Sequence, residues 1–297
     1  MIVRYDRRMG LHFDIVDVFT DRPYAGNPLA VVHRARTLTA RQMQALAAEF
    51  GLSETAFTLP PTTSGATYRV RIFTPTRELP FAGHPSIGAA WALGFADMIR
   101  LGDVVQECGV GLLPVHVDRD GARVVGGTPV VGPDLDGAQL AATVGLTADD
   151  LDPALPAGVA SAGVSFAFLA VTPEAVARAM PDPGAVARAT AEQTGLAVVA
   201  VDREKGTAHL RMFGPQVGVT EDPATGSAAV ALGVHLAARG ALRDGRSELS
   251  IAQGAEIGRP STLTVQVRVA GGAAAEVAVQ GGVRMVAKGE LLALPEP

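Results

Sequence analysis

Two similar helix starts, almost half a chain apart, constrain the fold more than any other feature of this sequence. Residues 85–90 read Pro-Ser-Ile-Gly-Ala-Ala, and residues 223–228 read Pro-Ala-Thr-Gly-Ser-Ala. Pro is favoured at the first position of a helix, so each motif predicts a helix that begins there. An alternating, strand-like run precedes each motif, at residues 68–74 and 209–213. A repeat spaced by about 138 residues, from Pro85 to Pro223, predicts two domains with one fold.

The length of 297 residues suits two domains of roughly 100–150 residues each. Alternating apolar and polar residues predict two strands, at residues 12–20 and 28–33, which pair as a hairpin. The spacing of apolar residues in Thr39–Phe50 predicts a helix, with Thr39 as its N-cap and Gly51 as its C-cap. Pro, Gly and Asp crowd residues 128–158, which indicates a boundary. We therefore expect an α+β chain with domains at 1–127 and 128–283, the first joined by a last strand at 284–297.

Composition and motifs exclude several classes of function. The chain has one cysteine, and its six histidines form no HExxH or HxH pair, so we expect no metal site. It has no GxGxxG after a strand and no GxxxxGK[ST], so we expect no nucleotide cofactor. A net charge of -5 without a basic cluster argues against nucleic acid. We also expect no membrane span, and a cytoplasmic protein, because no long apolar run follows Arg4, Arg7 and Arg8.

The two repeated helix starts are candidate anion sites. With Pro at the first helical position, His84 and Asp222 are predicted to be the N-caps. Asp is a good N-cap and His is not, which suggests that His84 has another task. Small residues follow both, and they leave the first N–H groups of the helix open to bind a substrate carboxylate. The alternative is that both are ordinary helix starts packed in a core.

Glu54 is the candidate acid or base, in the apolar segment Leu-Ser-Glu-Thr-Ala-Phe at residues 52–57. A carboxyl group enclosed by apolar walls has a raised pKa and can exchange protons near neutral pH. The alternative is a solvent-facing residue on an edge strand. Asn27 can equally be a turn residue, Ser227 can simply be small, and Gln253 can belong to an ordinary loop.

Together these segments resemble the PhzF-like isomerases of phenazine biosynthesis, which share the fold of diaminopimelate epimerase. The Gly-His-Pro and Asp-Pro-Ala-Thr-Gly-Ser elements are highly specific. The matching segments are spread over almost the whole chain, at residues 17–20, 26–31, 52–57, 71–75, 81–85, 221–227, 253–254 and 258–261.

The resemblance implies two pseudo-symmetric domains, each a curled β-sheet or barrel around a central helix, with the active site between them. It implies that Glu54 shuttles a proton with help from His84, Asp222 and Ser227. Relatives in this family isomerise trans-2,3-dihydro-3-hydroxyanthranilate and are usually homodimers. The residues expected to bind the substrate are Gly83, Pro85, Ser86, Gly226 and Asn27.

Cysteine count separates the branches of this fold. Diaminopimelate epimerase and proline racemase relatives use two facing thiols, whereas this chain has Glu54 and Ser227 at the matching places. We therefore predict a cofactor-independent isomerase that moves a proton on a small, carboxylate-bearing, cyclic amino acid-like substrate through one glutamate. The alternative is a non-catalytic protein on the same fold that binds a small metabolite or acts in regulation. A hydrolase with Ser227 as nucleophile lacks the GxSxG elbow.

Overall fold

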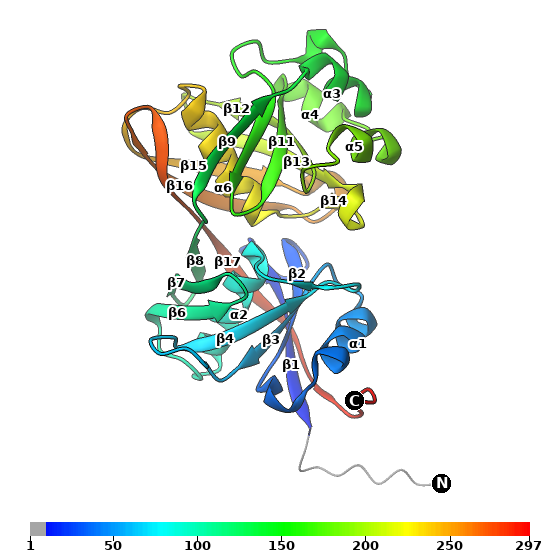
Figure 1. Cartoon of the computed structure of the whole chain (residues 1–297), viewed down its shortest axis with the longest axis vertical. Helices are drawn as coiled ribbons and strands as arrows, with labels where there is room; N and C mark the ends of the chain where they lie inside the picture. The colour runs from blue at the N-terminus through cyan, green and yellow to red at the C-terminus, as the bar shows by residue number, and fades with distance from the viewer. Residues whose placement is uncertain (1–9) are drawn as a thin grey trace. The chain divides into compact units, whose positions relative to one another are not determined.

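The computed structural model describes residues 10–297, and Figure 1 shows the path of the chain. The expectation of a cytoplasmic protein used Arg4, Arg7 and Arg8, and these three residues lie outside the described part of the chain. The chain divides into two compact units. Unit 1 contains the described residues up to Tyr24, with Pro28–Val124 and Gly282–Pro297; unit 2 contains Ala25–Asn27 and Val125–Gly281.

Unit 1 is a sheet that closes around one helix. Its successive strand pairs run β17-β1-β2-β3-β4-β6-β7-β8, and β8 pairs again with β17. The pairs β2–β3 and β4–β6 are parallel. The strands are β1 (Leu11–Val18), β2 (Asn27–Val32), β3 (Thr55–Leu59), β4 (Tyr68–Phe73), β5 (Glu78–Leu79), β6 (Gly102–Cys108), β7 (Gly111–Val117), β8 (Gly121–Val125) and the end of β17 (Ala273–Leu291). The helices are η1 (Ala35–Thr37), α1 (Ala40–Phe50) and α2 (Gly83–Phe95).

Unit 2 repeats this order of pairing. Its sequence of pairs is β9-β10-β11-β12-β13-β15-β16-β17, with β11–β12 and β13–β15 parallel. Gly126 donates to Val277 O and Gly127 to Ala162 O, so this segment closes the sheet. The strands are β9 (Pro129–Asp134), β10 (Gly158–Ala162), β11 (Ser165–Ala170), β12 (Leu196–Asp202), β13 (Thr207–Gly214), β14 (Val219–Asp222), β15 (Gly245–Gln253), β16 (Ser261–Ala270) and the start of β17. The helices are α3 (Gly137–Thr143), α4 (Pro173–Arg178), α5 (Pro183–Ala189), α6 (Gly226–Ala238), η2 (Ala148–Asp150), η3 (Pro215–Val217) and η4 (Ala255–Ile257).

Each enclosed helix is apolar on every side, because strands surround it. In unit 1, α2 packs against β1, β3, β4 and β7, and in unit 2, α6 packs against β9, β10, β11 and β16. Small residues let the strands approach. A Cβ on Gly88 would lie 2.5 Å from the side chain of Leu29 and 2.9 Å from that of Val18.

Helix α1 covers the outer side of the unit 1 sheet. Thr39 and Gln42 form the reciprocal N-terminal capping box, and Gly51 ends the helix in the left-handed conformation at φ 63°. Its buried face contains Met43 and Leu46, which join a core cluster with Phe57 of β3. Both predicted caps of this helix are confirmed, and α1 thereby supports the strand that follows Glu54.

Candidate functional site

Glu54 and His84 come together inside unit 1. Glu54 lies immediately before β3, and His84 is the second residue of α2, which packs against that strand. The distance from Glu54 Oε2 to His84 Nε2 is 3.5 Å, with 18% of the Glu54 side chain and 6% of the His84 side chain exposed. A carboxyl and an imidazole therefore face each other at the start of a buried helix.

Burial raises the pKa of the Glu54 carboxyl from its ordinary value of 4.5 to about 7, and a hydrogen bond with the Ser53 side chain partly opposes this rise. At neutral pH the carboxylate and the acid are both well populated, so the group can accept a proton and return it. The predicted raised pKa is confirmed. The alternative of a solvent-facing residue on an edge strand is wrong, because β3 lies between β2 and β4.

Helix α2 begins two residues earlier than its Pro motif predicts. Ala82, extended at φ -151° and ψ 146°, is the N-cap, and Gly83, His84 and Pro85 form the first turn. The prediction that His84 is the N-cap is wrong. The N–H groups of the whole first turn lack helical partners, so Pro85 is accommodated at the third position. Ser86 is fully buried, and its hydroxyl donates to Ala82 O at 2.9 Å.

Asp222 is also no N-cap, since it ends β14 and Thr225 precedes the first residue of α6. Pro223 and Ala224 form a short link in between, so the predicted helix start at Pro223 is wrong. Gly226 and Ser227 are the first two residues of α6, and Ser227 is half-buried. Pro223 therefore lies in the approach to α6, and the helix begins at Gly226, the fourth residue of the motif.

Asn27 belongs to unit 2, where it contacts Asp222. Its Nδ2 donates to Asp222 Oδ1 at 3.0 Å and to Ala224 O at 2.9 Å, and the residue is fully buried. Arg259 fixes the segment before it, donating to Gly26 O and Ala25 O, each at 2.9 Å. Asn27 is therefore more than a turn residue, because it orients one oxygen of the Asp222 carboxyl group.

The single cysteine of the chain is Cys108. Cys108 is half-buried at the β6–β7 turn, and its thiol lies 3.7 Å from Gly111 O.

Within residues 10–297 no cluster of three or more His, Cys, Asp or Glu side chains is arranged to hold a metal ion. In the same part of the chain, no helix combines the length and apolarity needed to cross a membrane.

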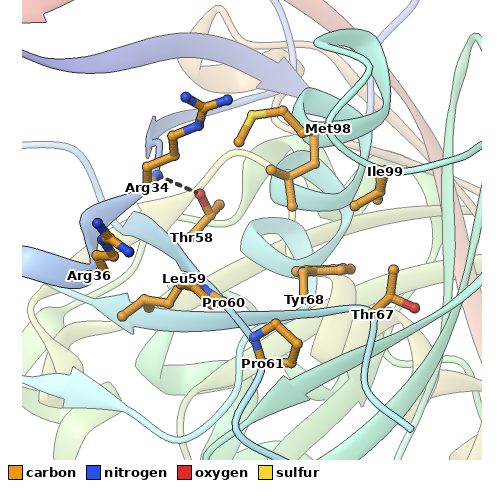
Figure 2. A pocket seen from close by; sticks show the side chains of 11 residues that line it. Arg34, Arg36, Thr58, Leu59, Pro60, Pro61, Thr67, Tyr68, Met98 and Ile99 are labelled. Carbon is orange, nitrogen blue, oxygen red and sulfur yellow. Dashed lines mark hydrogen bonds between the residues drawn. The ribbon is translucent and has the colours of Figure 1, made fainter.

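A cavity of about 480 Å³ opens in unit 1 near the other end of α2. Figure 2 shows Arg34 and Thr58 on one side of it and Met98 and Ile99 on the other. The Arg34 backbone N–H donates to Thr58 Oγ1 at 3.3 Å. None of the predicted site residues lines this cavity. It is therefore separate from the site that contains Glu54 and His84.

Each unit is therefore a sheet closed around one buried helix, and in unit 1 a carboxyl group with a raised pKa lies beside a histidine. Residues 16–289 match the PhzC-PhzF family, described as phenazine biosynthesis-like protein. The chain belongs to this family, whose named relatives are isomerases.

Two relatives illustrate the similarity. The chain is 37% identical over 302 residues to an uncharacterized isomerase of Mesorhizobium japonicum, covering 93% of this chain and 97% of the relative. It is 37% identical over 262 residues to the trans-2,3-dihydro-3-hydroxyanthranilate isomerase of Pseudomonas chlororaphis, covering 85% and 88%.

Solved structures agree with this assignment. The crystal structure of a PhzF-family phenazine biosynthesis protein of Bacillus anthracis matches with a TM-score of 0.86 and 26% identity, over 95% of this chain and 99% of that one. A hydroxyproline epimerase of Agrobacterium vitis matches with a TM-score of 0.66 and 16% identity, over 95% and 91%. At 16% identity, the similarity to the hydroxyproline epimerase shows a shared fold and nothing more.

Proposed function

We propose that this protein is a cofactor-independent isomerase that moves a proton on a small, carboxylate-bearing, cyclic amino acid-like substrate. The observation that carries the proposal is the half-buried Glu54 carboxyl, with a pKa of about 7, at 3.5 Å from His84. Family membership and the substrate named for the Pseudomonas relative support the same reaction type.

In this proposal the Glu54 carboxylate removes a proton from carbon, and the resulting acid returns it to another carbon of the conjugated system. One group that reaches both carbons suffices for such a shift, whereas epimerisation requires two opposed groups. Acid–base catalysis of this kind contributes about 10²–10⁴-fold in rate. Alignment of the bound substrate supplies much of the remainder.

The other candidates have supporting tasks. His84 assists the transfer beside Glu54, and Asp222 and Ser227 of unit 2 hold polar groups of a substrate. Gly83, Pro85 and Ser86 at the start of α2, and Gly226 and Asn27 in unit 2, stay the predicted substrate-binding residues, because first-turn N–H groups of a helix attract anions. The homodimer and the cytoplasmic location stay predictions.

A screen in deuterium oxide tests the proposal. The purified protein is incubated with trans-2,3-dihydro-3-hydroxyanthranilate and a panel of cyclic amino and hydroxy acids, and products are followed by mass spectrometry and NMR. An isomerase gives a rearranged product or deuterium on carbon with at least one compound. Binding without either change, detected by calorimetry, would instead support a metabolite-binding protein.

A further inference from the structure

Gln253 begins a directed chain of hydrogen bonds that ends on the carboxyl group of Asp222. It is the last residue of β15 and 1% exposed. Its Oε1 accepts the backbone N–H of Thr225 at 3.0 Å. Its Nε2 donates to the backbone oxygen of Asp222 at 2.8 Å and to Thr225 Oγ1 at 3.0 Å. Sequence pattern alone treated Gln253 as part of an ordinary loop.

Only one orientation of the Gln253 amide satisfies these partners. A flipped amide would place its NH₂ group against the Thr225 N–H and its oxygen against the Asp222 carbonyl, which pairs donor with donor and acceptor with acceptor. The amide is therefore held in one direction.

The orientation of the Gln253 amide determines which group accepts the hydrogen of the Thr225 hydroxyl. Since Thr225 Oγ1 accepts from Gln253, its own hydrogen goes to Asp222 Oδ2 at 2.5 Å. Asp222 Oδ1 accepts from Asn27. Thr225 is also the residue that precedes α6, yet its side chain makes no capping bond to that helix. A threonine here would ordinarily cap the helix, so its hydroxyl is diverted to the carboxyl group.

We propose that Thr225 and Gln253 are positioning residues of the reaction, which hold Asp222 as an oriented carboxylate through the chain Gln253 to Thr225 to Asp222. This inference rests on the proposed role of Asp222. Hydrogen bonds donated to a carboxylate favour its charged form, and two donors on different oxygens fix its plane.

The test compares Thr225→Val, Thr225→Ser and Gln253→Leu by ¹³C NMR titration of the Asp222 carboxyl group, with Asp222→Asn to assign the signal. Thr225→Val should raise the pKa of Asp222, because a hydrogen bond donated to the carboxylate is lost, and Thr225→Ser should restore it. The ion pair of Glu221 with Arg211 and the Arg259 guanidinium lie on neighbouring elements, and they are unchanged in every variant. An unchanged Asp222 pKa in Thr225→Val would overturn the inference.

Kinetics separate this inference from the proposed function. With a compound that the wild type converts, Thr225→Val and Gln253→Leu should each lower kcat roughly 10- to 100-fold, with a much smaller change in KM. The double variant should lose little more than either single one, because the residues act as a unit. If Asp222→Asn loses activity while both single variants keep the wild-type kcat, the positioning role is wrong and the proposed function stands. If Asp222→Asn is fully active, the assigned role of Asp222 fails.

Discussion

Glu54→Gln should make the folded protein more stable at neutral and alkaline pH. Burial raises the pKa of this carboxyl group from 4.5 to about 7, so ionising it in the fold is unfavourable. The folded state holds more protons than the unfolded state between these two values. Stability therefore falls as the pH rises through this window. A neutral glutamine of similar shape removes the unfavourable ionisation.

The magnitude follows from the two pKa values. At about 1.4 kcal/mol per pH unit, ionisation lowers the free energy of unfolding by about 3 kcal/mol at pH 7 and above, and by about 1 kcal/mol at pH 5. The gain in Glu54→Gln should accordingly be large at pH 8 and small at pH 5. Urea unfolding at both pH values measures it.

Glu49→Gln is the matched control, because Glu49 is an exposed glutamate of α1. It should leave the free energy of unfolding almost unchanged at both pH values. A Glu54→Gln variant that is equal to the wild type at pH 8, or less stable there, would refute the reasoning, since the carboxyl group would then be well solvated or well paired.

Three further variants test the packing and the caps. Gly88→Val should lower the free energy of unfolding by about 1–3 kcal/mol in urea titrations, because even a Cβ at this position meets Leu29 at 2.5 Å. Burial lowers the pKa of His235, stacked on Phe168, from 6.5 to about 4, so wild-type stability should fall as the pH drops through this range. His235→Phe should flatten that fall in pH-dependent thermal unfolding. Thr39→Ala should remove the α1 cap and lower stability by about 1 kcal/mol, measured by its urea midpoint.

Local signals in the sequence predicted the features that depend on near neighbours. Thr39 and Gly51 flank their helix directly, so the caps of α1 were predictable. The apolar residues around Glu54 made a raised pKa one of two interpretations, beside a solvent-facing residue, and the burial of the carboxyl group decides between them. The repeated motif indicated two similar units, and both units contain the same order of strand pairs around one helix. In each case the evidence lay within a few residues or in a repeated pattern.

Long-range contacts were beyond the sequence pattern. Asn27 bonds to Asp222, 195 residues away, and Gln253 reaches Thr225 across 28 residues. Nothing next to either residue indicates its partner. The N-caps were mispredicted for another reason. Pro85 is at the third position of its helix and Pro223 precedes its helix, so Pro marks the neighbourhood of a helix start but not its first residue.

The most direct test of the account is the turnover rate of Glu54→Gln, beside Glu49→Gln, on a compound that the wild type isomerises. Melting and ligand binding should show that both variants are folded and bind the compound. The account predicts that kcat falls at least about 100-fold in Glu54→Gln and stays at the wild-type value in Glu49→Gln. A Glu54→Gln variant that keeps a rate close to wild type would contradict the claim that Glu54 transfers the proton.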